Sequence, residues 1–290
     1  MIGSVFVLKN LGSDDIGGAI RRVIPQFEEP GIAVIMVGDI MLGRTVNSTS
    51  LKAGDWNYPF VHVSEYLGTG DIVYANLENP IIEECPTSNT GTVFCAPPSA
   101  LDGLKNYIDI VSLANNHAND YGGIGAVETE EHLREAGIGY TGRGALKIVE
   151  VGNTKFGFLG FNFFDKKLAE EDLELVRSSD GQVDVLFLGV HWGVEYTSEP
   201  TAQQRVWAKQ LVMAGADVIS GHHPHWVQSV EYINERPVYY SLGNFVFDQM
   251  WSEGTRRGLV VRLLFKDGEF VGEQRREIYM KNWAQPVFLE

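Results

Sequence analysis

Three histidines gather within the stretch GHHPHW, residues 221–226, although the chain has only 7. Pro224 disfavours a helical backbone at the preceding residue and so predicts an extended His223. Side chains alternate between the two sides of an extended segment, which places His223 and His225 on one side and His222 on the other. The stretch therefore predicts two imidazoles presented to one point, with His222 contributing little.

Polar side chains also follow the ends of segments that read as buried strands. In an open α/β sheet, ligands bind beyond the carboxyl ends of the strands. Each polar residue alone has an ordinary structural explanation, such as a helix cap, a turn or a buried hydrogen-bonded histidine. Together they are expected to converge on one edge of one sheet. The expected strands cover residues 31–38, 71–77, 107–114, 183–190 and 216–220, and the candidates after them are Asp39, Arg44, Asn76, Glu78, Asn115, Asn116, His117, Asn119, Asp120, His191, Glu195 and the histidines of GHHPH.

These donor types indicate a metal site. Imidazole nitrogen, carboxylate oxygen and amide oxygen together suit Zn, Mn or Fe. The only cysteines, Cys85 and Cys95, lie outside these clusters, which excludes a structural zinc held by thiolates. Nitrogen and oxygen ligands with open positions are typical of catalytic metals.

The elements that position these residues predict an α/β fold. Strands that alternate with helices indicate a parallel sheet covered on its faces. Later segments, residues 147–161, 226–243 and 258–280, read instead as antiparallel hairpins. Residues 1–30 are expected to form an N-terminal arm of uncertain structure, and residues 31–290 one domain with a mixed core. The expected helices cover residues 59–67, 99–107, 125–137 and 201–215.

Composition narrows the choice of partners. The net charge of −15 and the isoelectric point of about 4.9 argue against nucleic acid and anionic membranes, because phosphate backbones require a basic surface. No apolar run approaches the roughly 18 residues of a membrane helix, and the first residues do not read as a signal peptide. The NTG turn between Cys85 and Cys95 can bring the two sulfurs together as a disulfide, which would suggest an oxidising compartment; the alternative is two free thiols.

Six ordered motifs, spanning about residues 31 to 250, carry a resemblance to a known family. They are VGDIMLGR, ANLENP, SLANNHANDYG, GVHWGVEY, GADVISGHHPHWVQSVE and YSLGNFVFD. The chain resembles the bacterial CapA family of capsule proteins, which is associated with poly-γ-glutamate synthesis and is similar to calcineurin-like metallophosphoesterases. The resemblance implies a four-layer α/β/β/α sandwich with mixed sheets and one or two divalent metal ions.

The resemblance also implies a ligand set. One metal would be bound by Glu78, Asn116, His191 and His223, and a second by Asp39, Glu78 and His225. Met41 stands where the metallophosphoesterase pattern has a histidine ligand, so the second metal is expected to be weaker or absent. His117 matches the proton donor, but Ala118 replaces the acidic residue that normally follows it.

The implied function is metal-dependent hydrolysis at or around poly-γ-glutamate or another cell-surface polymer. A metal-bound water would attack a carbonyl or phosphoryl centre while His117 protonates the leaving group. Arg44 either clamps an anionic substrate or forms a surface ion pair, and Asn244 and Trp192 are candidate substrate contacts. The alternatives are a non-catalytic accessory subunit of polymer synthesis and export, or a phosphoesterase. The expected partners are an anionic polymer or small molecule and other capsule-synthesis subunits, at an extracellular or membrane-associated location.

Overall fold

The computed structural model describes residues 31–290, so the arm expected over residues 1–30 lies outside the described residues. One sheet has the strand order β14-β13-β12-β1-β2-β3-β4, and β11 pairs with the end of β1. Strands β1 to β4 run parallel, whereas β12, β13 and β14 are antiparallel to their neighbours. The strands are β1 (Ile32–Ile40), β2 (Ile72–Leu77), β3 (Ile110–Ser112), β4 (Gly139–Thr141), β11 (Asn244–Val246), β12 (Arg257–Lys266), β13 (Glu269–Met280) and β14 (Pro286–Phe288).

A second sheet has the order β5-β6-β7-β8-β10-β9. Its central strands β6, β7, β8 and β10 are parallel, and its edge strands β5 and β9 are each the antiparallel arm of a hairpin. These strands are β5 (Lys147–Val151), β6 (Thr154–Asn162), β7 (Val185–His191), β8 (Val218–His222), β9 (Val230–Ile233) and β10 (Arg236–Tyr239).

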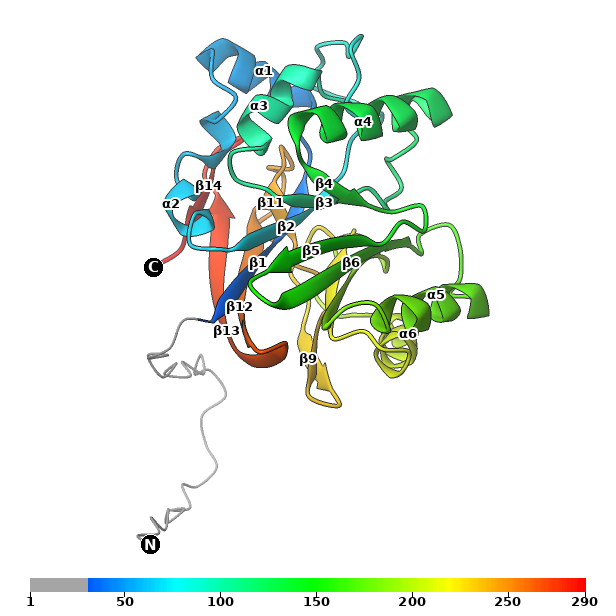
Figure 1. Cartoon of the computed structure of the whole chain (residues 1–290). Coiled ribbons are helices and arrows are strands. Elements are labelled where there is room, and N and C mark those ends of the chain that lie inside the picture. The colour runs from blue at the N-terminus through cyan, green and yellow to red at the C-terminus, as the bar shows by residue number, and fades with distance from the viewer. Residues whose placement is uncertain (1–30) are drawn as a thin grey trace, which may run out of the picture. The chain divides into compact units, whose positions relative to one another are not determined.

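The two sheets pack face to face between two layers of helices (Figure 1). Aromatic rings fill the space between the sheets, where Phe158 lies 5.1 Å from Tyr74 and 5.0 Å from Phe187, measured between ring centroids. This arrangement confirms the expected four-layer sandwich with mixed sheets. The first sheet is covered by α1 (Arg44–Ala53), α2 (Ser64–Leu67), α3 (Leu101–Leu104) and α4 (Gly122–Ala136), with short 3₁₀ turns at Tyr58–Phe60 and Pro98–Ala100, and the second by α5 (Glu170–Asp180) and α6 (Ala202–Met213).

The expectation of one sheet edge was wrong, because the five strands are divided between two sheets. Strands β1, β2 and β3 belong to one sheet and β7 and β8 to the other. The helices α1 and α5 were not anticipated, and the helices expected over residues 59–67 and 99–107 are broken into short turns. The three hairpins were predicted correctly.

Cys85 and Cys95 form a disulfide, so the first of the two alternatives is confirmed. The residues between them form an irregular loop. Among residues 31–290, none of the helices has the length and apolar character that crossing a bilayer requires.

Candidate metal centre

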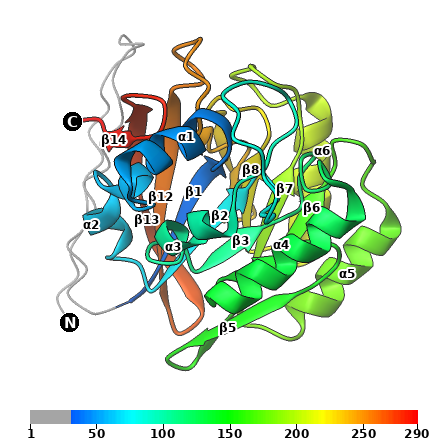
Figure 2. The same cartoon turned by 90° about the horizontal axis from the view of Figure 1, so that it is seen from above.

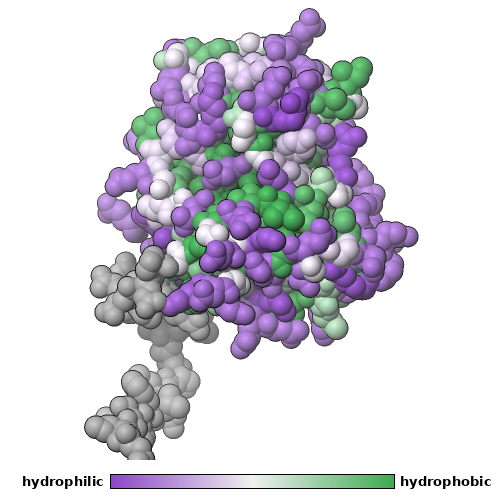
Figure 3. Space-filling model, in the orientation of Figure 1, coloured by the Kyte–Doolittle hydropathy of each residue, from purple (hydrophilic) through white to green (hydrophobic). Residues whose placement is uncertain are grey.

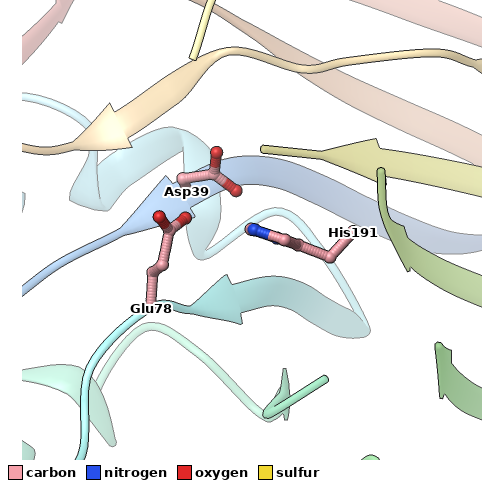
Figure 4. Close-up of side chains that lie close together, drawn as sticks. All are labelled: Asp39, Glu78 and His191. Carbon is pink, nitrogen blue, oxygen red and sulfur yellow. The ribbon is translucent and has the colours of Figure 1, made fainter. Parts of the chain in front are cut away.

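Asp39, Glu78 and His191 meet where the ends of strands from both sheets face each other (Figure 4). Asp39 lies at the end of β1, Glu78 directly follows β2, and His191 ends β7. One donor atom from each lies within 4.8 Å of the other two, and all three side chains are buried. Two facing sheets thus bring together residues that are far apart in the sequence.

A close backbone approach fixes the end of β1. The amide of Asp39 donates to the carbonyl oxygen of Gly243, 2.9 Å away, just before β11 begins. Only glycine fits at position 38, because a Cβ there would stand 2.0 Å from that same carbonyl oxygen. Asp39 consequently sits between two asparagines in register, Asn76 on β2 and Asn244 on β11.

Asn76 links the two buried carboxylates. Its Nδ2 donates to Oδ1 of Asp39 at 2.9 Å and to Oε2 of Glu78 at 3.1 Å. Its Oδ1 accepts a hydrogen bond from Asn115 at 3.1 Å. This amide network uses one oxygen of Glu78 for orientation and leaves the other, Oε1, facing the centre.

Three buried atoms at the centre that could bind a metal have no hydrogen-bond partner among the described residues. They are Oε1 of Glu78, Nδ1 of His191 and Nδ1 of His223. Buried polar atoms are normally paired, since leaving one unpaired costs about 1–3 kcal/mol. Carboxylate oxygen and imidazole nitrogen are ligands of Zn, Mn and Fe, so these residues fit a divalent metal.

Burial and the charges of neighbouring side chains shift the pKa values of the two carboxylates. The pKa of Glu78 is raised well above its usual value by burial and by the nearby charge of Asp39. Burial also opposes ionisation of Asp39, but contacts with His222 and His225 hold its pKa well below the usual value. A divalent cation beside both carboxylates would relieve this repulsion.

Three imidazoles at the centre, those of His191, His223 and His225, have pKa values shifted in different directions. Burial lowers the pKa of His191 well below its usual value and that of His223 to about 4, so both rings are neutral, as ligands must be. Burial acts in the same direction on His225, but Glu78 and then Asp39 outweigh it and raise its pKa to about 9. Nδ1 of His225 lies 2.9 Å from Oδ1 of Asn244, and its Nε2 lies 3.6 Å from Oε1 of Glu78.

The GHHPH segment is not extended as its sequence predicts. The φ angles of His223 and His225 are 95° and 56°, in the left-handed region, so alternation does not apply. Their rings are still neighbours, with centroids 6.2 Å apart. His222 reaches the centre as well: its Nδ1 lies 2.8 Å from Oδ1 of Asp39 and its Nε2 3.1 Å from Oγ of Ser220. The expectation that His222 points away from the other two imidazoles' side of the segment, away from the centre, was therefore wrong.

Asn116 and His117 lie beside the centre on the loop after β3. Oδ1 of Asn116 is 2.8 Å from Nε2 of His191. Nδ1 of His117 is 2.9 Å from Oδ2 of Asp120, and its ring stacks on Phe94 with centroids 3.9 Å apart. The acid missing at position 118 is thus supplied two positions later by Asp120, whose pairing with His117 the sequence analysis did not anticipate.

The Arg44 guanidinium is already engaged within the chain. It forms an ion pair with Asp248, donates to the carbonyl oxygen of Gly91 at 2.8 Å and lies 4.5 Å over the ring of Phe94. Only 12% of its side chain is exposed. Its contacts hold the disulfide-closed loop against the site. Arg44 therefore forms an ion pair, as the second alternative expects, but this pair is largely buried instead of lying at the surface.

The two residues expected to contact substrate are used internally. Trp192 is fully buried in the core of the second sheet, and its Nε1 donates to the carbonyl oxygen of Tyr240 at 2.9 Å. Asn244 is buried too, and its Nδ2 donates to Gln249 and Thr255 while its Oδ1 faces His225. We correct both expectations: Trp192 is a core residue, and Asn244 orients His225.

A buried thioether occupies the position of the missing histidine. Met41 is fully buried, and its Sδ accepts a hydrogen bond from the amide of Gly43 at 3.1 Å. The thioether therefore packs into the protein and supplies no nitrogen ligand beside Asp39.

Comparison with known proteins places the chain among capsule proteins. Residues 33–249 match the family model described as bacterial capsule synthesis protein PGA_cap. The capsule biosynthesis protein CapA of Bacillus anthracis is 32% identical, over 80% of this chain and 64% of that protein, so the chain spans less than two thirds of its length. The PGA biosynthesis protein CapA of Bacillus subtilis (strain 168) is 30% identical, over 87% of this chain and 73% of that protein.

Solved structures share the fold at low sequence identity. A hypothetical protein from Thermus thermophilus superposes with a TM-score of 0.57 at 15% identity, covering 85% of this chain and 98% of that one. A phosphatase from Mycoplasma pneumoniae gives 0.55 at 14% identity, covering 86% of this chain and 94% of that one. At these identities the likeness establishes the architecture and leaves the reaction open.

Proposed function

The chain belongs to the bacterial capsule synthesis protein family PGA_cap, and from this premise we propose that it is a metal-dependent hydrolase acting on poly-γ-glutamate. The observation that carries the proposal is the set of unpaired buried donors on Glu78, His191 and His223. A merely structural centre would pair these atoms with each other or with the backbone. Two of these residues, Glu78 and His191, also offer donor atoms within 4.8 Å of each other and of Asp39, which favours a bound cation.

Asp39, Glu78, His191 and His223 would hold the metal, with Asn116 and His225 at its sides. When bound, a divalent metal supplies Lewis-acid activation of the scissile carbonyl and of water at neutral pH. The surrounding amides fix the ligands: Asn76 orients both carboxylates and Asn116 orients His191. Removing such an outer contact commonly lowers metal affinity by about 10- to 100-fold.

His117 would act as the general acid. Asp120 engages its Nδ1 and Phe94 supports the face of its ring, so Nε2 is the nitrogen able to protonate a leaving group. In hydrolysis of a γ-glutamyl amide, water adds to the carbonyl carbon, the C–N bond breaks and the leaving nitrogen takes up a proton. General acids in such positions contribute roughly 10²- to 10⁴-fold to the rate.

A cell-envelope location accompanies this proposal. The matched relatives are named for capsule and PGA biosynthesis, and the chain carries a disulfide between Cys85 and Cys95. Disulfides persist in oxidising compartments, where a capsule polymer is also found. An anionic polymer substrate and other capsule-synthesis subunits as partners belong to the same proposal.

An accessory, non-catalytic role is the second candidate, favoured by Met41. The buried thioether at the place of a metal-binding histidine is what a degenerate two-metal site would contain. A phosphoesterase with one strong metal is the third candidate, favoured by the fold alone.

One experiment separates the three candidates. The purified chain is analysed for bound metal and then incubated with poly-γ-glutamate, a phosphodiester and a phosphomonoester in the presence of Mn²⁺. Glu78→Gln is the matched control, because it keeps the side-chain shape and removes the charge. Shortening of poly-γ-glutamate by the wild type but not by Glu78→Gln supports the proposal. Turnover of phosphate esters alone would favour a phosphoesterase, and the absence of both retained metal and turnover would favour the accessory role.

A further inference from the structure

A cavity of about 610 Å³ lies beside the candidate metal centre, on the side of β3 and β6. Its size is within the range of small-molecule binding sites. It lies between α4 and α5, which cover different sheets at the same end of the molecule (Figures 1 and 2). The face seen in Figure 3 is largely hydrophilic, with hydrophobic side chains gathered near its middle.

Two chain segments border both the metal centre and the cavity. In the loop after β3, Asn116 contacts His191 at the centre, and the next-but-one residue, Ala118, lines the cavity. After β6, Phe164 lies against His223 with ring centroids 4.7 Å apart, whereas Lys166 lines the cavity. A ligand in the cavity would therefore lie next to the candidate metal centre.

The cavity has an apolar interior and a charged rim. Leu77, Leu113 and Phe161 contribute apolar surface to its lining. On the α4 side, Arg143 pairs with Glu130 at 3.3 Å. On the α5 side, Lys166 pairs with Asp172 at 2.7 Å.

Both rim ion pairs are open to exchange with a ligand. Arg143 and Lys166 are 60% and 53% exposed, and exposed ion pairs contribute little to stability. Asp165 adds a third acid, so the lining carries two cations and three carboxylates. Such a rim does not attract a purely anionic segment. It matches a ligand that carries an ammonium and a carboxylate on the same short unit.

We propose that this cavity binds the amino-terminal residue of a γ-glutamyl chain. Because γ-linkage uses the side-chain carboxyl group, each internal residue offers only an α-carboxylate, and only the amino-terminal residue also has a free α-ammonium group. The ammonium faces the acids of the rim, the carboxylate faces Arg143 or Lys166, and the methylene groups lie against the apolar lining. Recognition of this end directs hydrolysis by the protein to bonds near the amino terminus of the polymer; this last point rests on the proposed function.

The test measures binding to metal-stripped protein, so it does not depend on hydrolysis. The probes are γ-glutamylglutamate and its N-acetyl derivative, titrated by calorimetry at one fixed low salt concentration. We expect the free dipeptide to bind and N-acetylation to weaken binding at least 10-fold. Arg143→Ala and Lys166→Ala should each weaken binding of the dipeptide about 10-fold. Arg134→Ala is the matched control, because Arg134 is an exposed cation on α4 that pairs with Glu131 outside the cavity.

Absence of dipeptide binding, equal binding of the acetylated probe, or rim variants that behave like Arg134→Ala would overturn the proposal. Intact binding in a chain that fails to hydrolyse any polymer would refute only the proposed function. Hydrolysis that proceeds equally well from chains with blocked and free amino termini would refute only the recognition of the amino end.

Discussion

Replacing His222 by alanine should weaken metal binding, although His222 is not itself placed among the ligands. The side chain is buried, with 1% of its surface exposed, and Nδ1 lies 2.8 Å from Oδ1 of Asp39. A hydrogen bond to a charged group contributes about 1.5–3 kcal/mol. If the whole of this goes into holding Asp39 in place, metal affinity falls about 10- to 100-fold, which is also the range measured for residues that orient metal ligands.

The assay is a competition titration of Zn²⁺ or Mn²⁺ against a chromogenic chelator, with urea unfolding measured in parallel. His222→Asn is the matched control, because the asparagine Nδ2 can occupy the place of the imidazole Nδ1 and donate to Asp39. We expect His222→Asn to recover most of the affinity lost in His222→Ala. Wild-type affinity in His222→Ala would show that the hydrogen bond to Asp39 does not support metal binding, and equal losses in the two variants would show the same.

Three further predictions follow from the same contacts. Asp120→Asn should lower kcat about 10-fold or more without changing KM or stability in steady-state and urea measurements, because it removes the charge beside His117 while the amide oxygen can still accept from the backbone N–H of Phe94; a change in KM alone would contradict this. Cys85→Ser opens a loop with a sequence separation of 10 and should cost about 3 kcal/mol in urea unfolding, as should reduction of the wild type; an unchanged midpoint would show that the loop does not depend on the bond. Gly38→Ala should destabilise the chain by more than about 2 kcal/mol because of its clash with backbone, whereas Gly123→Ala, in an open position on α4, should stabilise it by about 0.5–1 kcal/mol in the same assay.

Strand ends could be recognised from the sequence because burial produces a strong local pattern. The runs that become β1, β2 and β7 are fully or almost fully buried, and the polar residues that follow them stand out. Asp39, Glu78 and His191 were identified in this way, and the structure brings them together. The same pattern carries no information on which sheet a buried strand joins, since a strand covered on both faces looks alike in either sheet. The division into two sheets is therefore visible only once the hydrogen-bonded neighbours of each strand are known.

The residues that support the ligands were harder to predict because their roles depend on backbone geometry. His222 was expected to point away because the segment was taken as extended, yet the positive φ angles that follow it at His223 and His225 break the alternation. These angles occur beside a place where two backbone segments of the protein lie very close together. A Cβ on Gly221 would stand 2.1 Å from the carbonyl oxygen of Tyr240. Such long-range contacts leave no mark on the local sequence.

Chemical type alone misassigned the residues expected to contact substrate. Tryptophan and asparagine suit a binding cleft, but they also suit a hydrophobic core and a buried hydrogen-bond network, and Trp192 and Asn244 take those structural roles. For Asp120, the spacing of three positions from His117 predicts the contact, because a carboxylate at this distance along the sequence can reach Nδ1 of the histidine within a tight turn. A search for an acid within three residues of the histidine would have found it.

The most direct test of the metal centre is an anomalous diffraction measurement on crystals of the chain grown with Zn²⁺, collected on both sides of the metal's absorption edge. We expect a strong peak within about 2.0–2.2 Å of donor atoms from Asp39, Glu78 and His191, the usual zinc bond lengths. A strong peak elsewhere on the molecule, with none between these three residues, would contradict this expectation.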